Sequence, residues 1–164
     1  TCALPISLDK IGNYSRKIET IINHVKNSQG IVMIYSQYIQ GGCIPLALAL
    51  EELGLSRYDD SKSLFKRKNK NPHMFKNEKG KLFKGKYIMI TGDPILSPNN
   101  EAELKVCTNS NNTYGEYVKV VIISRAGSEG LDFKNVRQIH LMEPWYNLNR
   151  TNQTIWRRNQ RVRA

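Results

Sequence analysis

The sequence lacks the residue patterns by which several common classes of catalytic site are recognised. Its 164 residues contain no GxxxxGK(S/T) loop to cradle nucleotide phosphates. The cysteines and histidines form no CxxC or Cys/His pair that would indicate zinc, and neither Ser124 nor Ser128 has a neighbouring histidine to act as its base. There is also no apolar run near the ~18 residues needed to span a bilayer. These absences argue against a self-contained hydrolase, a metal site and a membrane-spanning segment.

Cysteine usage indicates the compartment. Cys2, Cys43 and Cys107 are widely spaced and odd in number, which does not suit a disulfide framework. A reduced environment is the default for such a chain, so we expect an intracellular location. The chain starts at Thr1 rather than Met, and we expect it to be a piece of a longer protein.

Positive charge is concentrated in one segment, residues 56–86. Eleven Lys or Arg residues oppose three acids there, so the segment holds +8 of the net charge of +11. Such a concentration indicates a polyanionic partner, most simply nucleic acid, whereas the alternative is a solvated insertion whose charge serves solubility. Nothing in the segment has a stable hydrophobic period, so we expect a long loop or partly ordered insertion.

Elsewhere, strands and helices alternate, which predicts an α/β domain with a parallel sheet covered on both faces. Right-handed crossovers would bring the strand ends at Ser36, Thr91, Ser124 and Glu143 to one rim. His140 falls inside an apolar strand and is interpreted as a satisfied core residue. The expected strands are 31–35, 87–91, 118–124 and 136–142, and the expected helices are 16–27 (capped by Ser15), 44–53 and 100–106.

The stretch Val118–Asp132 is the centre of the predicted site. It begins as an apolar, β-branched run and then turns sharply through small residues and glycines. Open α/β sheets bind their ligands at such carboxyl ends of strands. A row of donors there could hold a strand's phosphates, or each donor could simply satisfy its own strand end. The donors are Ser36, Gln37, Tyr38, Thr91, Ser124 and the backbone amides around Gly127.

From Leu148 onward the pattern is helical and rich in arginine. Arg157, Arg158 and Arg161 follow Gln153, and on a helix Arg157 and Arg161 share a face. Planar guanidinium groups suit a developing phosphoryl charge, and an arginine that reaches across a domain cleft contributes ~10³–10⁵ in rate. A basic helix that is only solvated, or that binds nucleic acid backbone, fits the same residues. The residues alone leave both interpretations open.

The order of the segments resembles the second RecA-like domain of superfamily 2 helicases. The residues of these segments are similar to those of the helicase-like transcription ATPases of large nucleocytoplasmic DNA viruses. This group includes the poxvirus early transcription factor and nucleoside triphosphatase types. The segments are IVMIYSQY (31–38), YIMITGD (87–93), SRAGSEGLD (124–132), MEPWYN (142–147) and QTIWR (153–157).

The resemblance implies a RecA-like three-layer fold, with a mostly parallel central sheet and helices on both faces. It also implies which residues carry the function. Those implied to contact nucleic acid are Tyr35, Ser36, Gln37, Thr91, Ser124, Arg125, Ala126 and Gly127. Those implied at the nucleotide are Gly130, Asp132, Gln153 and Arg157, with Arg161 as a further catalytic arginine and Glu129 as the residue that couples the nucleotide to the strand.

The last helix departs from the family pattern Q-x-x-G-R-x-x-R. Trp156 stands where glycine is expected, and Gln160 stands where the second arginine belongs. Arg161 comes one place late, and one position on a helix is ~100° of rotation, so it does not simply replace a residue at 160.

We therefore expect residues 1–164 to be a single helicase C-terminal domain with a basic insertion at about 56–86 and without its N-terminal ATPase domain. It would bind ATP and Mg²⁺ together with that missing domain, grip nucleic acid (DNA rather than RNA), and act in a viral transcription complex. A virion or host-cytoplasm location would follow. As an isolated fragment we expect no enzyme activity. The alternative is a non-catalytic basic adaptor that keeps the fold and has lost its arginine finger.

Overall fold

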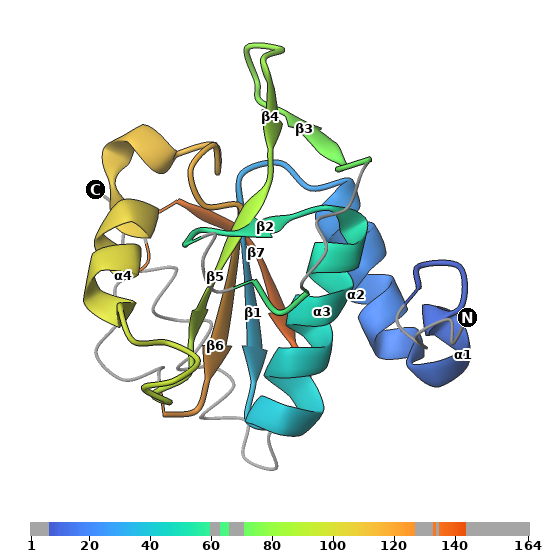
Figure 1. The fold of residues 1–164 in the computed structure, drawn as a ribbon. Helices are drawn as coiled ribbons and strands as arrows, with labels where there is room; N and C mark the ends of the chain where they lie inside the picture. The colour runs from blue at the N-terminus through green and yellow to red at the C-terminus, as the bar shows by residue number, and fades with distance from the viewer. Residues whose placement is uncertain (1–6, 60–62, 66–70, 127–132, 134, 144–164) are drawn as a thin grey trace.

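A parallel sheet forms the centre of the molecule (Figure 1). The structure is a computed structural model, and it describes residues 7–59, 63–65, 71–126, 133 and 135–143. Within these ranges five strands join in the order β2-β5-β6-β1-β7, and every neighbouring pair is parallel. The strands are β1 Ile31–Ser36, β2 Ser56–Arg57, β5 Lys86–Ile90, β6 Val120–Ser124 and β7 Val136–Leu141.

Alternate residues of the central strands enter two separate cores. Val32 and Ile34 of β1 pack with α2 and α3, whereas Ile31 and Met33 lie in the core beneath α4. Figure 1 shows α2 and α3 on one side of the sheet and α4 on the other. The predicted three-layer α/β fold with a mostly parallel sheet is therefore confirmed. The helices are α1 Ile11–Tyr14, α2 Arg16–Lys26, α3 Ile44–Leu53 and α4 Asn100–Thr108.

Local signals in the sequence account for the two longer helices. The Ser15 side chain accepts a hydrogen bond from the backbone N–H of Ile18 and caps α2. Pro45 occupies the first turn of α3, and Gly54 ends that helix in the left-handed conformation (φ 102°). A π-helical turn, Ile39–Cys43, leads into α3. None of the helices in the described ranges has both the length and the apolar character needed to span a bilayer.

Part of the basic segment is folded, which agrees with a partly ordered insertion and not with a long loop. β3 (Met74–Lys76) and β4 (Leu82–Lys84) form an antiparallel hairpin, and β2 joins the main sheet. Phe75 of β3 is buried, with 3% of its surface exposed. Strands of two or three residues are too short to display a hydrophobic period, which is why the pattern did not indicate them.

Glu51 of α3 holds the chain that leads to the hairpin. Its buried carboxylate accepts hydrogen bonds from the backbone N–H groups of Leu64 (2.9 Å) and Phe65 (2.7 Å) and from the Ser63 hydroxyl (3.0 Å). The hydroxyl of Tyr87 donates a fourth, at 2.6 Å. Four donors offset the cost of burying this charge, and three of them fix residues 63–65 against α3.

The hairpin lies at the amino ends of the parallel strands. β4 ends at Lys84 and β5 begins at Lys86, so the hairpin runs directly into the start of the sheet. Figure 1 shows it projecting from the end of the sheet opposite to the strand tips. Its lysines are therefore on the other edge of the sheet from the predicted rim.

His140 differs from the satisfied core residue that we expected. It lies half-buried on β7, and its ring stacks on His24 of α2 with 5.3 Å between centroids. Its Nε2 atom is buried and has no hydrogen-bond partner among the described residues. Desolvation and, to a smaller extent, the neighbouring His24 hold the pKa of His140 below its ordinary value.

Asn112 connects the end of α4 to the start of β6. It belongs to a 3₁₀ turn, Ser110–Asn112, and is completely buried. Its Nδ2 group donates to the carbonyl oxygens of Cys107 and Val118, both at 3.1 Å, and its Oδ1 atom accepts from the N–H groups of Tyr117 (2.9 Å) and Val118 (3.0 Å). The side chain thus satisfies four backbone groups that the sheet leaves unpaired, three of them in buried bonds.

We predict that Asn112→Ala lowers the free energy of unfolding by about 3 kcal/mol, because it leaves buried donors and acceptors without partners. Asn111→Ala, at the exposed neighbouring position, is the matched control and should change stability by less than about 0.5 kcal/mol. Chemical denaturation of both variants checks this. Equal losses in the two variants would contradict the role given to Asn112.

Lys119 is a buried cation at the amino edge of the sheet. Only 1% of its surface is exposed, and its ammonium group donates to the carbonyl oxygens of Ser28 (3.0 Å) and Gly30 (2.7 Å). The same nitrogen lies 5.0 Å from the centroid of the Phe75 ring. Desolvation lowers the pKa of Lys119 to about 8. Lys119 therefore joins the connection between α2 and β1 to the base of the hairpin.

We predict that the free energy of unfolding rises with pH above about pH 8 because of Lys119. The folded state loses the lysine proton near that pH, whereas the unfolded chain keeps it until the ordinary lysine value, so the unfolded state binds more protons in this window. The rise should approach ~1 kcal/mol per pH unit and be absent from Lys119→Met. Denaturation of both proteins across the window, with the exposed-site variant Lys79→Met as control, measures it. Parallel pH profiles for the original chain and Lys119→Met would contradict this prediction.

Candidate nucleic-acid interface

The carboxyl ends of the parallel strands form one rim. Ser36 at the end of β1 pairs in register with Ser124 at the end of β6, and Ile90 of β5 pairs with Ile123. The backbone N–H of Met142, just after β7, donates to the carbonyl oxygen of Tyr35 at 2.8 Å. The strand order thus brings together the four segments that the sequence placed at a common edge.

Most hydroxyl groups of this rim are buried and bonded within the protein. The Ser124 hydroxyl donates to the carbonyl oxygen of Thr91 at 2.7 Å, and the Thr91 hydroxyl shares a hydrogen bond with that of Ser97, also at 2.7 Å. Ser36 donates to Glu143 at 3.0 Å. Tyr35 is also buried, with 2% of its surface exposed. These side chains join the strand ends to one another, which supports the second of the two interpretations left open for the row of donors.

A smaller set of rim residues reaches the surface. Gln37 is half-buried, whereas Tyr38 is 60% exposed and Arg125 and Ala126 are exposed. Gly92 has a φ of 73°, and a Cβ atom there would lie 2.9 Å from the Cβ atom of Ala126. The turns after β5 and β6 are therefore packed against each other. A ligand at this rim therefore meets the amide of Gln37, the phenol of Tyr38, the guanidinium of Arg125 and the backbone of two closely packed turns.

Glu143 positions the first exposed residues of the rim. One carboxylate oxygen accepts from the Ser36 hydroxyl, and the other accepts from the backbone N–H of Gln37 at 2.9 Å. The backbone N–H of Tyr38 in turn donates to the Ser36 oxygen at 3.2 Å. A Cβ atom at Gly42 would lie 1.9 Å from the Ser36 oxygen, so only glycine lets the π-helical turn pass so close. This chain of contacts fixes the direction in which the backbone leaves β1.

Sequence reasoning placed Glu143 at the rim but gave it no role. The one local signal is an acidic residue directly after a buried strand. Its partners lie more than 100 positions earlier in the chain. Nearby, the thiol of Cys43 has its pKa raised to about 11, mainly by desolvation and further by the charge of Glu143. In the described ranges, no group of three or more His, Cys, Asp or Glu residues is placed to hold a metal ion.

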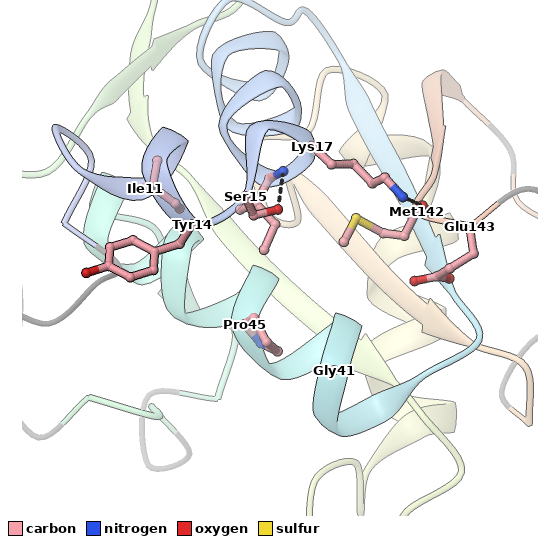
Figure 2. Close-up of a pocket in the computed structure, with 9 residues that line it drawn as sticks. Ile11, Tyr14, Ser15, Lys17, Gly41, Pro45, Met142 and Glu143 are labelled. Atoms are coloured by element: carbon pink, nitrogen blue, oxygen red, sulfur yellow. Dashed lines mark hydrogen bonds between the residues drawn. The ribbon is translucent and has the colours of Figure 1, made fainter.

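A hollow of about 450 Å³ lies beside Glu143 (Figure 2). Lys17 of α2 spans one side of it, where its ammonium group donates to the carbonyl oxygen of Met142. None of the described residues that line the hollow is among those implied to bind nucleic acid or nucleotide. It is lined by Ile11, Tyr14, Ser15, Lys17, Ile18, Gly41, Pro45, Met142 and Glu143.

The other predicted functional residues lie outside the described ranges. Gly127, which is implied to contact nucleic acid, and Glu129, which is implied to couple the nucleotide to the strand, are two of them. The residues implied to bind the nucleotide, and those that depart from the family pattern, also lie outside the described ranges. Their roles therefore remain predictions. These residues are Gly130, Asp132, Gln153, Trp156, Arg157, Gln160 and Arg161.

Comparison with known proteins supports the resemblance noted in the sequence. The chain is 30% identical over 158 residues to a termination factor NPH-I homolog of African swine fever virus, which covers 86% of this chain and 22% of that protein. It is 29% identical over 157 residues to a putative ATP-dependent RNA helicase of Acanthamoeba polyphaga mimivirus, covering 93% and 23%. A putative helicase of Invertebrate iridescent virus 3 is 24% identical over 148 residues, covering 88% and 14%.

The chain therefore spans about a fifth of the length of the African swine fever virus and mimivirus relatives. No protein-family model matches it. The predicted similarity to helicase-like proteins of large DNA viruses is confirmed over most of the chain.

We predict that Glu143→Ala lowers the free energy of unfolding by about 2 kcal/mol, because it removes the charged acceptor of two hydrogen bonds. It should also speed hydrogen exchange at the backbone N–H of Gln37, which loses its carboxylate acceptor. Glu143→Gln keeps one carbonyl oxygen and should give a smaller effect on both. NMR-detected exchange checks this, and an unchanged rate at Gln37 in Glu143→Ala would contradict it.

Proposed function

We propose that this chain, which is related to helicase-like proteins of large DNA viruses, is the second RecA-like domain of an ATP-dependent nucleic acid motor. The observation that carries the proposal is a likeness to helicases and termination factors over 86–93% of the chain. A parallel sheet whose strand ends share one rim supports it. The viral relatives further favour a role in viral transcription.

The proposed division of labour places the chemistry between two domains. ATP and Mg²⁺ would be held mainly by an N-terminal RecA-like domain of the same parent protein. This chain would complete the site with Gly130, Asp132, Gln153, Arg157 and Arg161, and Glu129 would relay the nucleotide state to the rim. Guanidinium groups placed across a cleft stabilise the charge on a transferring phosphoryl group. Domain closure around ATP would then move the rim relative to the bound strand.

At the rim, the half-buried Gln37 and the exposed Tyr38, Arg125 and Ala126 would bind the phosphate backbone of one strand, with DNA as the expected nucleic acid. The amide, the guanidinium and backbone N–H groups can bond phosphate oxygens without reading bases. The exposed ring of Tyr38 offers a surface on which a base can stack. The buried residues Ser36, Thr91 and Ser124 would support these groups from beneath.

The second candidate is a non-catalytic basic adaptor that binds nucleic acid or a transcription complex. Trp156 and Gln160 favour it, because a bulky ring and a neutral side chain replace the glycine and the second arginine of the family pattern. Trp156→Gly combined with Gln160→Arg, in the longer protein that contains the N-terminal domain, discriminates between the two. A motor should change its ATPase rate, whereas an adaptor should not.

The direct test of the division of labour is the ATPase rate of this chain alone, with and without nucleic acid. We expect no turnover above background, because the phosphate-cradling loop is absent from these residues. Robust nucleic-acid-stimulated turnover would refute the proposal.

We predict that Arg125→Ala weakens binding of single-stranded DNA about tenfold and reduces the slope of log affinity against log salt by about 1. Lys105→Ala, at an exposed position on α4 away from the rim, is the matched control and should leave both quantities unchanged. Fluorescence anisotropy over a salt series measures them. A loss of affinity that is equal in the two variants would mean that only overall charge matters.

A further inference from the structure

The β3–β4 hairpin presents two different faces. Met74 pairs with Lys84, and Lys76 pairs with Leu82, so these four side chains share one face of the two-stranded sheet. All four are exposed, Met74 by 40% and Leu82 by 59%. We call this set the outer face. The opposite face consists of Phe75 and Phe83, whose rings lie 5.9 Å apart and pack on the core.

The inner face anchors the hairpin to the domain. The Phe75 ring lies beneath the ammonium group of Lys119 and meets the ring of His73 edge-on, with 4.8 Å between centroids. A Cβ atom at Gly85 would lie 2.4 Å from the Phe75 ring, so the glycine makes room for it. The hairpin is thus a docked element, and its position relative to the sheet is set by core packing.

Polar contacts order the tip of the hairpin. The Asn77 side chain accepts from the backbone N–H of Lys81 at 2.8 Å and donates to Glu116 on the loop before β6. The Glu78 carboxylate pairs with Arg137 of β7 at 3.3 Å. A surface that is already ordered loses little conformational entropy when it binds a partner.

The lysines of the hairpin retain an uncompensated charge. Lys76, Lys79, Lys81 and Lys84 are all exposed, and none of them forms an ion pair with another described residue. The hairpin's own acid, Glu78, is engaged by Arg137. Four positive charges therefore lie on one ordered hairpin, residues 74–84, and they attract a polyanion.

The composition of the outer face favours a nucleic acid backbone over a protein. Protein interfaces are depleted in lysine and enriched in arginine, methionine and aromatic rings. The outer face has two lysines beside Met74 and Leu82, and it has no arginine or aromatic ring. Lysine is a point charge on a flexible stem, which suits contacts with phosphates irrespective of sequence. Proteins that bind single strands without sequence preference stack bases on aromatic side chains, which this face lacks. A duplex is the polyanion that fits.

The outer face is far from the rim. β5 alone, five residues at about 3.3 Å each, separates the two edges by roughly 16 Å, and the hairpin projects further in the opposite direction. One short stretch of strand does not touch both surfaces of the same chain. They are two sites.

We propose that the outer face of the β3–β4 hairpin, with Lys79 and Lys81 at its tip, is a second nucleic-acid site that binds the phosphate backbone of a duplex. This inference rests on the proposed function in one respect: a motor domain that grips one strand at its rim works beside duplex. The hairpin would hold that duplex while the rim holds the strand drawn from it.

The test compares a duplex of random sequence with its single strand by fluorescence anisotropy, using the whole chain between about 50 mM and 200 mM salt. The hairpin variant replaces all four lysines by glutamine. We expect it to lose about tenfold or more in duplex affinity and about 3.6 in the salt slope, and to bind the single strand as before. Arg125→Ala should show the reverse pattern. Lys84→Gln alone should lower the duplex slope by about 0.9, and Lys105→Gln should not change it.

The outcomes separate this inference from the proposed function. If the hairpin variant keeps the duplex affinity, or loses affinity for both ligands equally, the second site does not exist. If an acidic polypeptide competes with the duplex as well as nucleic acid does, the surface is a protein site and the inference is overturned. If the unaltered chain binds no single strand while its duplex binding still depends on the hairpin, the rim proposal fails and the inference stands.

A second measurement does not depend on the variant folding. Acetylation of the unaltered chain reports the accessibility of each lysine. Duplex should protect Lys76 and Lys84 several-fold and leave Lys105 reactive, whereas the single strand should protect none of the three. Equal reactivity of Lys76 with and without duplex would overturn the inference.

Discussion

Burial of the parallel sheet on both faces is the constraint on which the rest of the structure depends. β1 lies between β6 and β7, and its first four residues, 31–34, alternate between two apolar cores. Since neither face of the central strands β1 and β6 meets water, their polar chemistry is confined to the two ends of the strands. Both functional surfaces proposed for this chain lie at those ends, one at the carboxyl rim and one at the amino edge.

The polar groups at the carboxyl and amino ends of the strands are satisfied by different kinds of side chain. At the rim, short hydroxyl side chains and Glu143 bond the strand ends to each other and leave a few exposed groups in fixed positions. At the amino edge, longer side chains from distant elements do the same work. Lys119 and Asn112 each satisfy backbone groups that the ladder leaves unpaired, and the hairpin covers what remains. A ligand at either end therefore meets a surface already held in place.

Sequence patterns predicted the elements whose signals are local. α2 was placed to within one residue because Ser15, a regular apolar stripe and the following glycine all lie inside one short window. The rim followed from strand order alone. The hairpin did not, since its strands are too short for a hydrophobic period and its position is fixed by the packing of Phe75 against His73, Phe83 and Lys119. The exposed subset of the rim and the role of Glu143 also escaped, because burial of Ser36, Thr91 and Ser124 depends on contacts between segments far apart in the chain.

The contact between Lys119 and Phe75 also restricts how this domain can diverge. A lineage can lengthen or shorten the turn between Asn77 and Lys81 without touching the core. It cannot delete the hairpin in one step, because Phe75 would leave a void and a buried ammonium group beside it. Loss of the insertion requires a compensating change at Lys119. Among related domains, the identity of this one residue should therefore report whether a hairpin is present, even where the insertion itself is too variable to align.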